Sequence, residues 1–201
     1  MSTSDRAQEA VSFASRTRER LRQEILAAAI QEVIAGGWRG LRMQSVAGSV
    51  GISRQTINAE FADKRGLAQA LVLSIAAAYA DECAQIIEDS RDLESGMRDS
   101  FRRGLEQAAA DQVFKVVMTP DSSDTFLPLY TSDGAPLVTL IATRIAAAMA
   151  RRWPELDPER LRVGSNASVR FILSHIVLPL QPIEQTAEEA VRLFVPFFQA
   201  R

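Results

Sequence analysis

Residues 44–61 have the sequence QSVAGSVGISRQTINAEF, in which small and apolar residues are spaced as two short helices joined by a tight turn require. Ala47 falls in the middle of the first predicted helix, where its methyl group lets a second helix cross closely. Gly51 follows one turn later and can adopt a positive φ without steric cost, which allows a sharp turn. Ile57 then points into the angle between the helices. This spacing predicts a helix-turn-helix, a motif typical of DNA-binding proteins.

The second helix of this motif begins with polar side chains. Ser53 stands where an N-cap belongs, and the helix opens with Arg54, Gln55 and Thr56, which can contact base edges or phosphates. An antiparallel helical hairpin also needs a small residue and a turn glycine, so Ala47 and Gly51 alone leave a purely structural hairpin open.

The flanking segments favour DNA binding. Upstream, residues 16–35 predict one helix with a broad apolar stripe, which Gly36 and Gly37 end. Downstream, Asp63 is a predicted N-cap of a long helix whose first residue is Lys64. A cation is unfavourable at a helix N-terminus unless a phosphate lies nearby, so Lys64 is a predicted phosphate contact.

Over residues 16–70 the chain resembles the N-terminal domain of the tetracycline-repressor (TetR) family. The resemblance is carried by the long first helix, by GWRGLRMQSVA at 37–47, by GISRQTI at 51–57, and by Glu60, Phe61, Lys64 and Leu67. It implies a homodimeric transcriptional regulator, in most cases a repressor, which a small molecule in the C-terminal domain releases from operator DNA.

Two positions depart from the family pattern. Asn58 replaces the usual tyrosine of the recognition helix, and Arg42 stands where a threonine often caps the preceding helix. Arg42 is long enough to reach the DNA backbone. The candidate DNA contacts are therefore Arg42, Gln44, Ser53, Arg54, Gln55, Thr56, Asn58 and Lys64.

The expected fold is all-α, with a helix-turn-helix three-helix domain followed by a larger helical domain. We expect a disordered tail at 1–15, a DNA-binding domain at 16–64, and a ligand-binding and dimerisation domain at 65–201. Residues 1–65 carry ten Lys and Arg against seven Asp and Glu, whereas residues 66–201 carry thirteen against eighteen. The positive charge therefore lies in the segment expected to attract phosphate.

Other classes of protein have little support. Cys83 is the single cysteine, which excludes an internal disulfide, and its expected role is packing. Asp121 and Asp124 fall in a predicted polar loop at 119–125 without a patterned third ligand, so no metal site is expected. Ser174 and His175 are adjacent on a predicted helix and point about 100° apart, so they cannot form a nucleophile and base pair.

Neither an enzyme nor a bound cofactor is therefore expected. No run of about 18 apolar residues predicts a membrane span, and the polar N-terminus does not look like a signal peptide. The expected location is the cytoplasm.

Apolar side chains in the middle helices are candidates for a pocket that binds a small hydrophobic effector, although ordinary core packing explains them equally well. They are joined by one histidine, and the set is Phe101, Leu105, Phe114, Val117, Met118, Leu127, Tyr130, Leu137, Ile141, Phe171 and His175.

The last two predicted helices, at about 158–178 and 186–199, have apolar surfaces too wide for one neighbour. We expect them to pair with their copies in a four-helix homodimer interface, and the alternative is that they close the core of one chain. The candidate interface residues are Val169, Leu173, Ile176, Val177, Val191, Phe194, Val195 and Phe198.

The sequence thus predicts a DNA-binding repressor released by a hydrophobic effector. Its Glu60-Phe61 ending resembles that of a subgroup regulating lipid or alkane metabolism in high-GC bacteria, and an excess of 21 Arg over 2 Lys fits a GC-rich genome. This resemblance implies a fatty acid or acyl chain as effector. Asn58, Ala59 and the acidic Glu60 leave open an interaction protein without specific DNA binding, and an unrecognised helical-bundle enzyme is a further alternative.

Overall fold

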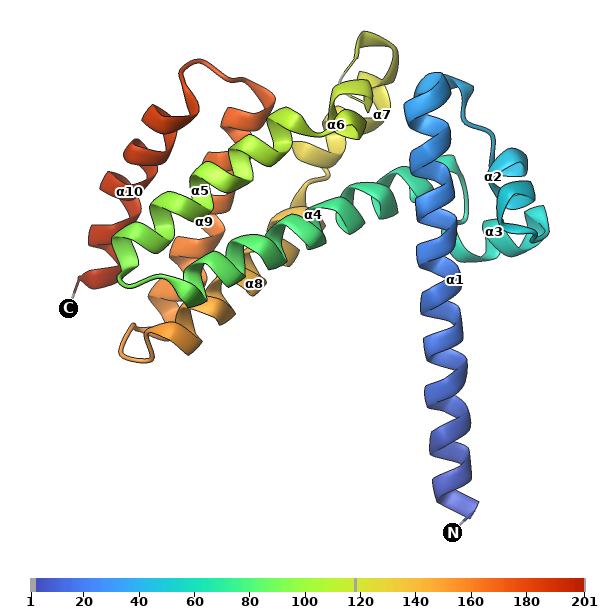
Figure 1. The fold of residues 1–201 in the computed structure, drawn as a ribbon, viewed down its shortest axis with the longest axis horizontal. Helices are drawn as coiled ribbons and strands as arrows, with labels where there is room; N and C mark the ends of the chain where they lie inside the picture. The colour runs from blue at the N-terminus through green and yellow to red at the C-terminus, as the bar shows by residue number, and fades with distance from the viewer. Residues whose placement is uncertain (1–2, 118, 201) are drawn as a thin grey trace. The chain divides into compact units, whose positions relative to one another are not determined.

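A computed structural model describes residues 3–117 and 119–200, with side chains at 13–116 and 119–200. Within these ranges the chain forms ten helices and no strand, so the all-α prediction is confirmed (Figure 1). The chain divides into two compact units, residues 1–71 and 72–201. The division falls inside a helix, a few residues beyond the domain boundary that the sequence predicted after Lys64.

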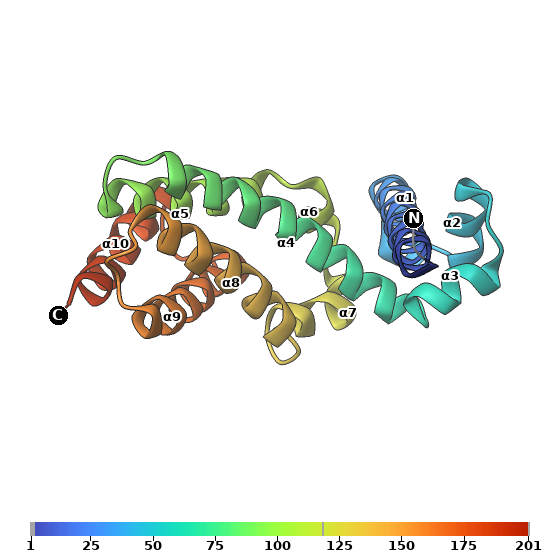
Figure 2. The same ribbon diagram turned by 90° about the horizontal axis from the view of Figure 1, so that it is seen from below.

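The first unit contains α1 (Thr3–Gly40), α2 (Met43–Val50), α3 (Arg54–Phe61) and the beginning of α4 (Lys64–Asp89). Figures 1 and 2 show α2 and α3 beside one end of α1, while the N-terminal part of α1 extends past them.

The start of α1 differs from the sequence prediction, which placed a disordered tail at 1–15. The helix begins at Thr3, and Met1 and Ser2 lie outside the described residues. The segment 3–15 contains three alanines and neither glycine nor proline, and it continues without a break into the predicted helix at Arg16. At the other end Gly37, with a φ of 72°, interrupts the helical conformation as predicted.

The turn between α2 and α3 has the predicted geometry. Gly51 has φ 77° and ψ 28°, and its N–H donates to the carbonyls of Ala47 and Gly48 at the end of α2. Ala47 and Ile57 are completely buried in the angle between the two helices. Local backbone requirements therefore fix the crossing of the helix-turn-helix.

The turn between α3 and α4 is tighter. Ala62 has φ 63° and ψ −63°, and the N–H of Asp63 donates to the carbonyl of Phe61 at 2.7 Å, which is the geometry of a γ-turn. The Asp63 carboxylate accepts from the N–H of Gly66 at 2.8 Å and caps α4, as predicted. A Cβ at Gly66 would lie 1.9 Å from the Phe61 carbonyl oxygen, so only glycine fits there.

The second unit contains the rest of α4, followed by α5 (Leu93–Ala110), α6 (Gln112–Val117), α7 (Pro120–Tyr130), α8 (Ala135–Arg152), α9 (Pro158–Val177) and α10 (Ile183–Gln199). α5 packs against both α9 and α10, and α8 packs against α9 (Figures 1 and 2). The largest fully buried side chains of their shared core are Ile87, Met97, Met149 and Phe198.

The start of α7 corrects the predicted loop at 119–125, because α7 begins at Pro120. Proline lacks an N–H and suits the first turn of a helix, and the Asp121 carboxylate is favourable at the positive end of the helix dipole. The same residue types that predict a loop also begin a helix.

The apolar composition of α4 is that of a core helix. Among the described residues, α4 is long and apolar enough to cross a membrane, and α7 with α8 is so only as a pair bent by 56°. The protein itself buries 44% of the apolar window of α4, and core helices of soluble proteins often have this composition, so support for a membrane span is weak.

Cys83 on α4 donates its thiol to the Ser100 carbonyl at 3.4 Å, and burial raises the pKa of this thiol to about 11.

The close approach at Gly66 gives the first testable prediction. Gly66→Ala should lower the free energy of unfolding by about 1–3 kcal/mol, because the added methyl group must displace the Phe61 carbonyl. Gly48→Ala is the matched control: a Cβ there meets no atom within 4 Å, and helix propensity should raise stability by about 0.5–1 kcal/mol. Urea unfolding measures both, and a shift of the same sign in both variants would contradict the packing described at Gly66.

Candidate nucleic-acid interface

The first turn of α3 presents the longest polar side chains of the motif. The Ser53 hydroxyl accepts from the N–H of Thr56 at 3.0 Å, and the two hydroxyls lie 2.9 Å apart, so the predicted N-cap is present. The Ser53 hydroxyl is therefore used to cap the backbone at the start of α3. Arg54 and Gln55 are exposed at the same helix end, where side chains of a recognition helix meet base edges.

Three other predicted contacts lie around this turn. Arg42 precedes α2 with extended backbone, and its side chain makes no cap, so the threonine cap of the family pattern is not replaced. Arg42 and Gln44 are both exposed, whereas Asn58 is half-buried on α3. Arg42 and Gln44 can therefore approach a DNA backbone more freely than Asn58.

Lys64 is placed differently from the sequence expectation of a phosphate contact. Its ammonium donates to the carbonyls of Trp38 at 2.6 Å and Leu41 at 2.8 Å, with a longer bond of 3.5 Å to that of Arg39. It also lies 4.8 Å from the centre of the Trp38 ring. Burial, and then the charge of Arg42, lower the pKa of Lys64.

This placement has a physical reason. The break at Gly37 and the end of α1 leave carbonyls without helical partners, and a cation is favourable at the C-terminal end of a helix. An ammonium has three donors, and these carbonyls engage them. Lys64 therefore ties the start of α4 to the end of α1 in this structure, which leaves little donor capacity for a phosphate.

Glu60, near the end of α3, is held by two arginines of α1. Its carboxylate oxygens accept from Arg18 Nε at 2.8 Å and from an Arg22 guanidinium nitrogen at 2.7 Å. The Arg22 guanidinium also lies 4.7 Å from the centre of the Phe61 ring. Burial raises the pKa of the Glu60 carboxyl, but the hydrogen bonds and charges of both arginines outweigh burial, so its pKa lies below the usual 4.5.

No pattern in the sequence indicates this cluster. Arg18 and Arg22 are spaced i,i+4 and so share one face of α1, but nothing in the sequence pairs that face with Glu60. Because the Glu60 carboxylate is paired, its negative charge no longer argues against DNA binding.

The predicted effector residues are divided among several environments. Phe101, Leu105 and Leu137 are buried, Ile141 is partly buried against the core, and Leu127 is 40% exposed. Phe114 packs edge-on against Tyr130 with ring centres 5.6 Å apart, and the Phe171 ring lies 4.3 Å from that of His175. His175 Nδ1 lies 2.8 Å from the Phe171 carbonyl. The side chains of Val117 and Met118 lie outside the described residues.

A polar group that the sequence did not indicate lies beside the Phe114 and Tyr130 pair. The Tyr79 hydroxyl donates to the Asp111 carboxylate, which also accepts from the N–H of Phe114 at 2.7 Å and so caps α6. Burial and the negative charge of Asp111 raise the pKa of both Tyr79 and Tyr130. The O–H of Tyr79 is committed to Asp111, whereas the Tyr130 hydroxyl is protonated at physiological pH and can donate a hydrogen bond.

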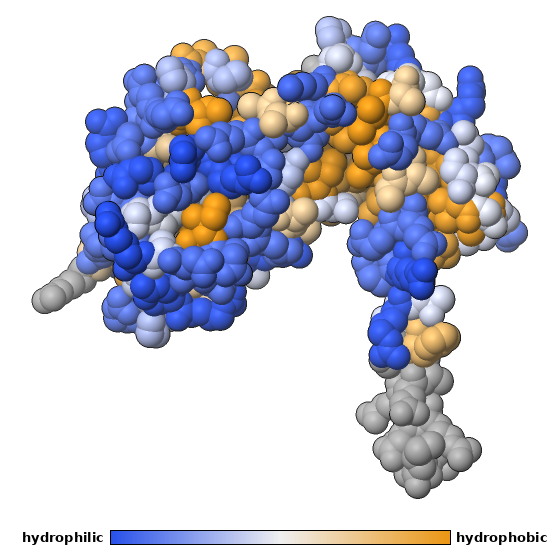
Figure 3. All heavy atoms as spheres, viewed as in Figure 1, coloured by the Kyte–Doolittle hydropathy of each residue, from blue (hydrophilic) through white to orange (hydrophobic). Residues whose placement is uncertain are grey.

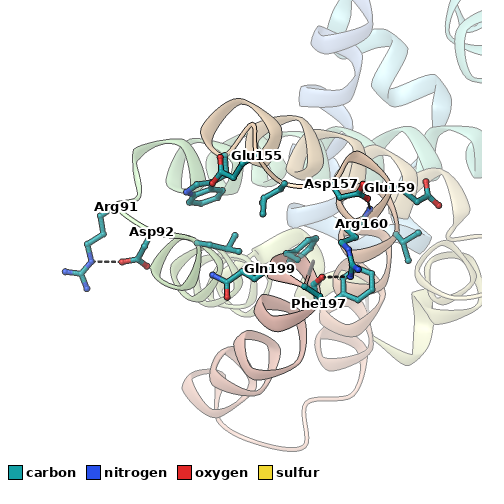
Figure 4. A pocket seen from close by; sticks show the side chains of 14 residues that line it. Arg91, Asp92, Glu155, Asp157, Glu159, Arg160, Phe197 and Gln199 are labelled. Carbon is teal, nitrogen blue, oxygen red and sulfur yellow. Dashed lines mark hydrogen bonds and ion pairs between the residues drawn. The ribbon is translucent and has the colours of Figure 1, made fainter.

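A pocket of 1080 Å³ lies elsewhere in the second unit, between the start of α5, the α8–α9 connection and the end of α10 (Figure 4). Its lining contains none of the predicted effector residues. The side chains around it include the pair Arg91 and Asp92 and the Arg160 guanidinium, which donates to the Phe197 carbonyl at 3.1 Å. Charged side chains and aromatic rings thus share this pocket.

The predicted dimer residues are mostly committed to the core of one chain. Five of them are buried: Val169, Leu173, Val191, Val195 and Phe198. The other three, Ile176, Val177 and Phe194, are partly buried. The apolar stripes of α9 and α10 pack against each other, and they also pack against α5 and α8. This packing corrects the sequence prediction that placed these five residues on an intermolecular surface.

Other apolar residues of α9 and α10 remain on the surface. Val163, Leu193 and Phe197 are exposed on the helices, and Leu178 and Leu180 are exposed on the connection between them. In the view of Figure 3 the surface over α5 and α10 is mostly hydrophilic, with small apolar areas.

Both parts of the chain match family models of known proteins. Residues 25–71 match the bacterial regulatory proteins of the tetR family, and residues 92–196 match the C-terminal domain of the bacterial tetracycline repressor. The first match covers the helix-turn-helix, and the second covers most of the second unit.

Individual relatives agree with these matches. The transcriptional regulator AlkX of Mycobacterium tuberculosis is 30% identical over 93% of this chain and 89% of the relative. The crystal structure of the repressor AlkX from a Dietzia species, implicated in biodegradation of n-alkanes, has a TM-score of 0.77 at 23% identity and covers 89% of this chain and 95% of its own. RolR in complex with resorcinol has a TM-score of 0.65 at 15% identity and covers 90% of each chain.

The contacts of Lys64 give a second prediction. Lys64→Ala should lower the free energy of unfolding by about 1.5–3 kcal/mol, because buried carbonyls lose charged donors. Lys115, the other lysine of the chain, is exposed on α6 and provides the control. Lys115→Ala removes the same charge and should change the free energy of unfolding by less than about 0.5 kcal/mol. Equal stability of the two variants in urea unfolding would mean that Lys64 is not a structural tie.

Proposed function

The chain belongs to the tetracycline-repressor family of bacterial regulatory proteins, and we propose that it is a repressor whose homodimer leaves its operator when a hydrophobic effector binds. Members of this family are DNA-binding transcriptional regulators and not enzymes. The cytoplasm is the location that fits this proposal.

The first turn of α3 carries the proposal for operator recognition. Ser53 holds the backbone of that turn, and Arg54 and Gln55 project from it without being buried. An arginine side chain can bond to guanine and a glutamine side chain to adenine in the major groove. We assign base contacts to Arg54 and Gln55, and backbone contacts to Arg42 and Gln44.

The exposed apolar residues of α9 and α10 support a homodimer. Val163, Leu193 and Phe197 are large apolar side chains left on the two helices after their core faces are buried. A second copy of the same helices would cover them in a four-helix arrangement. Two recognition helices are needed because one half-site is short and binds weakly.

A molecule with a long hydrocarbon chain is the proposed effector. Support comes from the aromatic pair of Phe114 and Tyr130, beside the neutral Tyr130 hydroxyl and the hydrogen bond from Tyr79 to Asp111. Such a site combines apolar lining with a few polar groups, as small-molecule sites do. The Dietzia AlkX repressor is implicated in n-alkane biodegradation, and we extend this chemistry to fatty acids and acyl chains.

Base recognition by Arg54 and Gln55 is tested with operator fragments selected from genomic DNA. Arg54→Ala or Gln55→Ala should weaken binding to the selected fragment by about 1–3 kcal/mol and relax base choice at one position of each half-site. Arg102→Ala, on the exposed surface of α5, should leave operator affinity unchanged. If the α3 variants lose selected and random DNA equally, Arg54 and Gln55 do not read bases.

The effector is tested by thermal melting with fatty acids, acyl-CoA and n-alkanes. A ligand at a hundred times its dissociation constant adds about 2.7 kcal/mol of stability, which corresponds to a rise in Tm of roughly 5–10 °C for a chain of this size. The same ligand should release the operator fragment. A Tm unmoved by all three classes would overturn the proposed effector and leave operator binding standing.

A further inference from the structure

Glu60 is an acidic side chain on the helix that is expected to meet a polyanion, and this position calls for a physical reason. The Glu60 side chain is only 14% exposed, and each of its two oxygens accepts from a different arginine of α1. Burying a carboxylate without such partners would be costly. The two arginines therefore hold this face of α3 against α1.

The same bonds also constrain the arginines. The Arg18 side chain is 70% exposed and the Arg22 side chain 31% exposed, yet both guanidinium groups are directed onto a residue of α3. Cations beside a recognition helix lie where DNA phosphates run when that helix enters the groove. Free arginines there would bind phosphates of any sequence, because phosphate contacts carry no base information.

We propose that Glu60 is a specificity-determining positioning residue, whose carboxylate makes Arg18 and Arg22 orient the recognition helix instead of binding DNA phosphates of any sequence. This inference rests on the proposed operator binding. Glu60 touches no base; it acts through the two arginines.

Two opposite effects of Glu60→Gln follow from this role. The amide keeps the size of the side chain but loses the charge that holds two guanidinium groups, so α3 is less firmly oriented and operator affinity falls. The released arginines become available to phosphate, so affinity for random DNA rises. The slope of log K against log salt for random DNA should steepen by up to about 0.9 for each arginine released.

Glu24→Gln is the matched control. Glu24 lies on α1 and pairs with Arg20 at 3.0 Å, and both side chains are well exposed. The Glu24→Gln substitution makes the same change of charge, in the same unit, as Glu60→Gln. This pair links two residues of α1 one turn apart. The control should change affinity for the operator and for random DNA by a similar factor and so leave their ratio unchanged.

The experiment measures binding of the full-length protein to its selected operator fragment and to a random fragment between 50 and 200 mM salt. We expect Glu60→Gln to lower the ratio of the two affinities by about tenfold, on the scale of typical specificity ratios of 10³ or more. In an Arg18→Gln, Arg22→Gln background, adding Glu60→Gln should change that ratio no further.

The other outcomes overturn the proposal in distinguishable ways. If Glu60→Gln behaves like Glu24→Gln, the pairing does not set specificity. If both affinities fall together with the melting temperature, Glu60 only supports the fold. If the wild-type protein selects no fragment, operator binding itself fails, and this inference fails with it.

Discussion

The position of α3 against α1 is the constraint on which the rest of the first unit depends. Burial of Ile57 in the angle between α2 and α3, and of Phe61 beneath the Arg22 guanidinium of α1, supplies apolar contacts that have no direction of their own. Polar bonds supply the direction: Ser53 fixes the first turn of α3, and Glu60 fixes its last turn through two arginines. Lys64 then ties the following helix to the end of α1. DNA recognition needs this orientation, because base edges are read only by side chains held at a defined depth and angle.

The second unit differs from the first, because its helices bury most of their apolar surface against one another. Val191, Val195 and Phe198 fill its core. What is left outside is a smaller set of apolar side chains on α9 and α10, which a second copy would cover under the proposed function. Under the proposed function, an effector can release DNA only if it binds the DNA-free and DNA-bound conformations with different affinities.

Local features of the fold were predictable from the sequence, and long-range features were not. Gly51, Ser53 and Asp63 act on backbone within four residues, so spacing alone assigns them. Lys64 was expected on a phosphate because its partners, carbonyls at the end of α1, lie more than twenty residues away in the chain. An apolar stripe likewise does not name the surface that covers it, which is why residues of α10 were assigned to a dimer interface. The Glu60 cluster joins residues that are 42 and 38 positions apart in the chain, and no local sequence pattern indicates it.

A crystal structure of the homodimer bound to its operator would show directly which side chains meet bases and which meet phosphates. We expect Arg54 and Gln55 to contact base edges in the major groove, Glu60 to remain paired with Arg18 and Arg22, and the Lys64 ammonium to remain bonded to the carbonyls at the end of α1. A complex in which Arg18, Arg22 and Lys64 have left these partners for DNA phosphates would contradict this expectation.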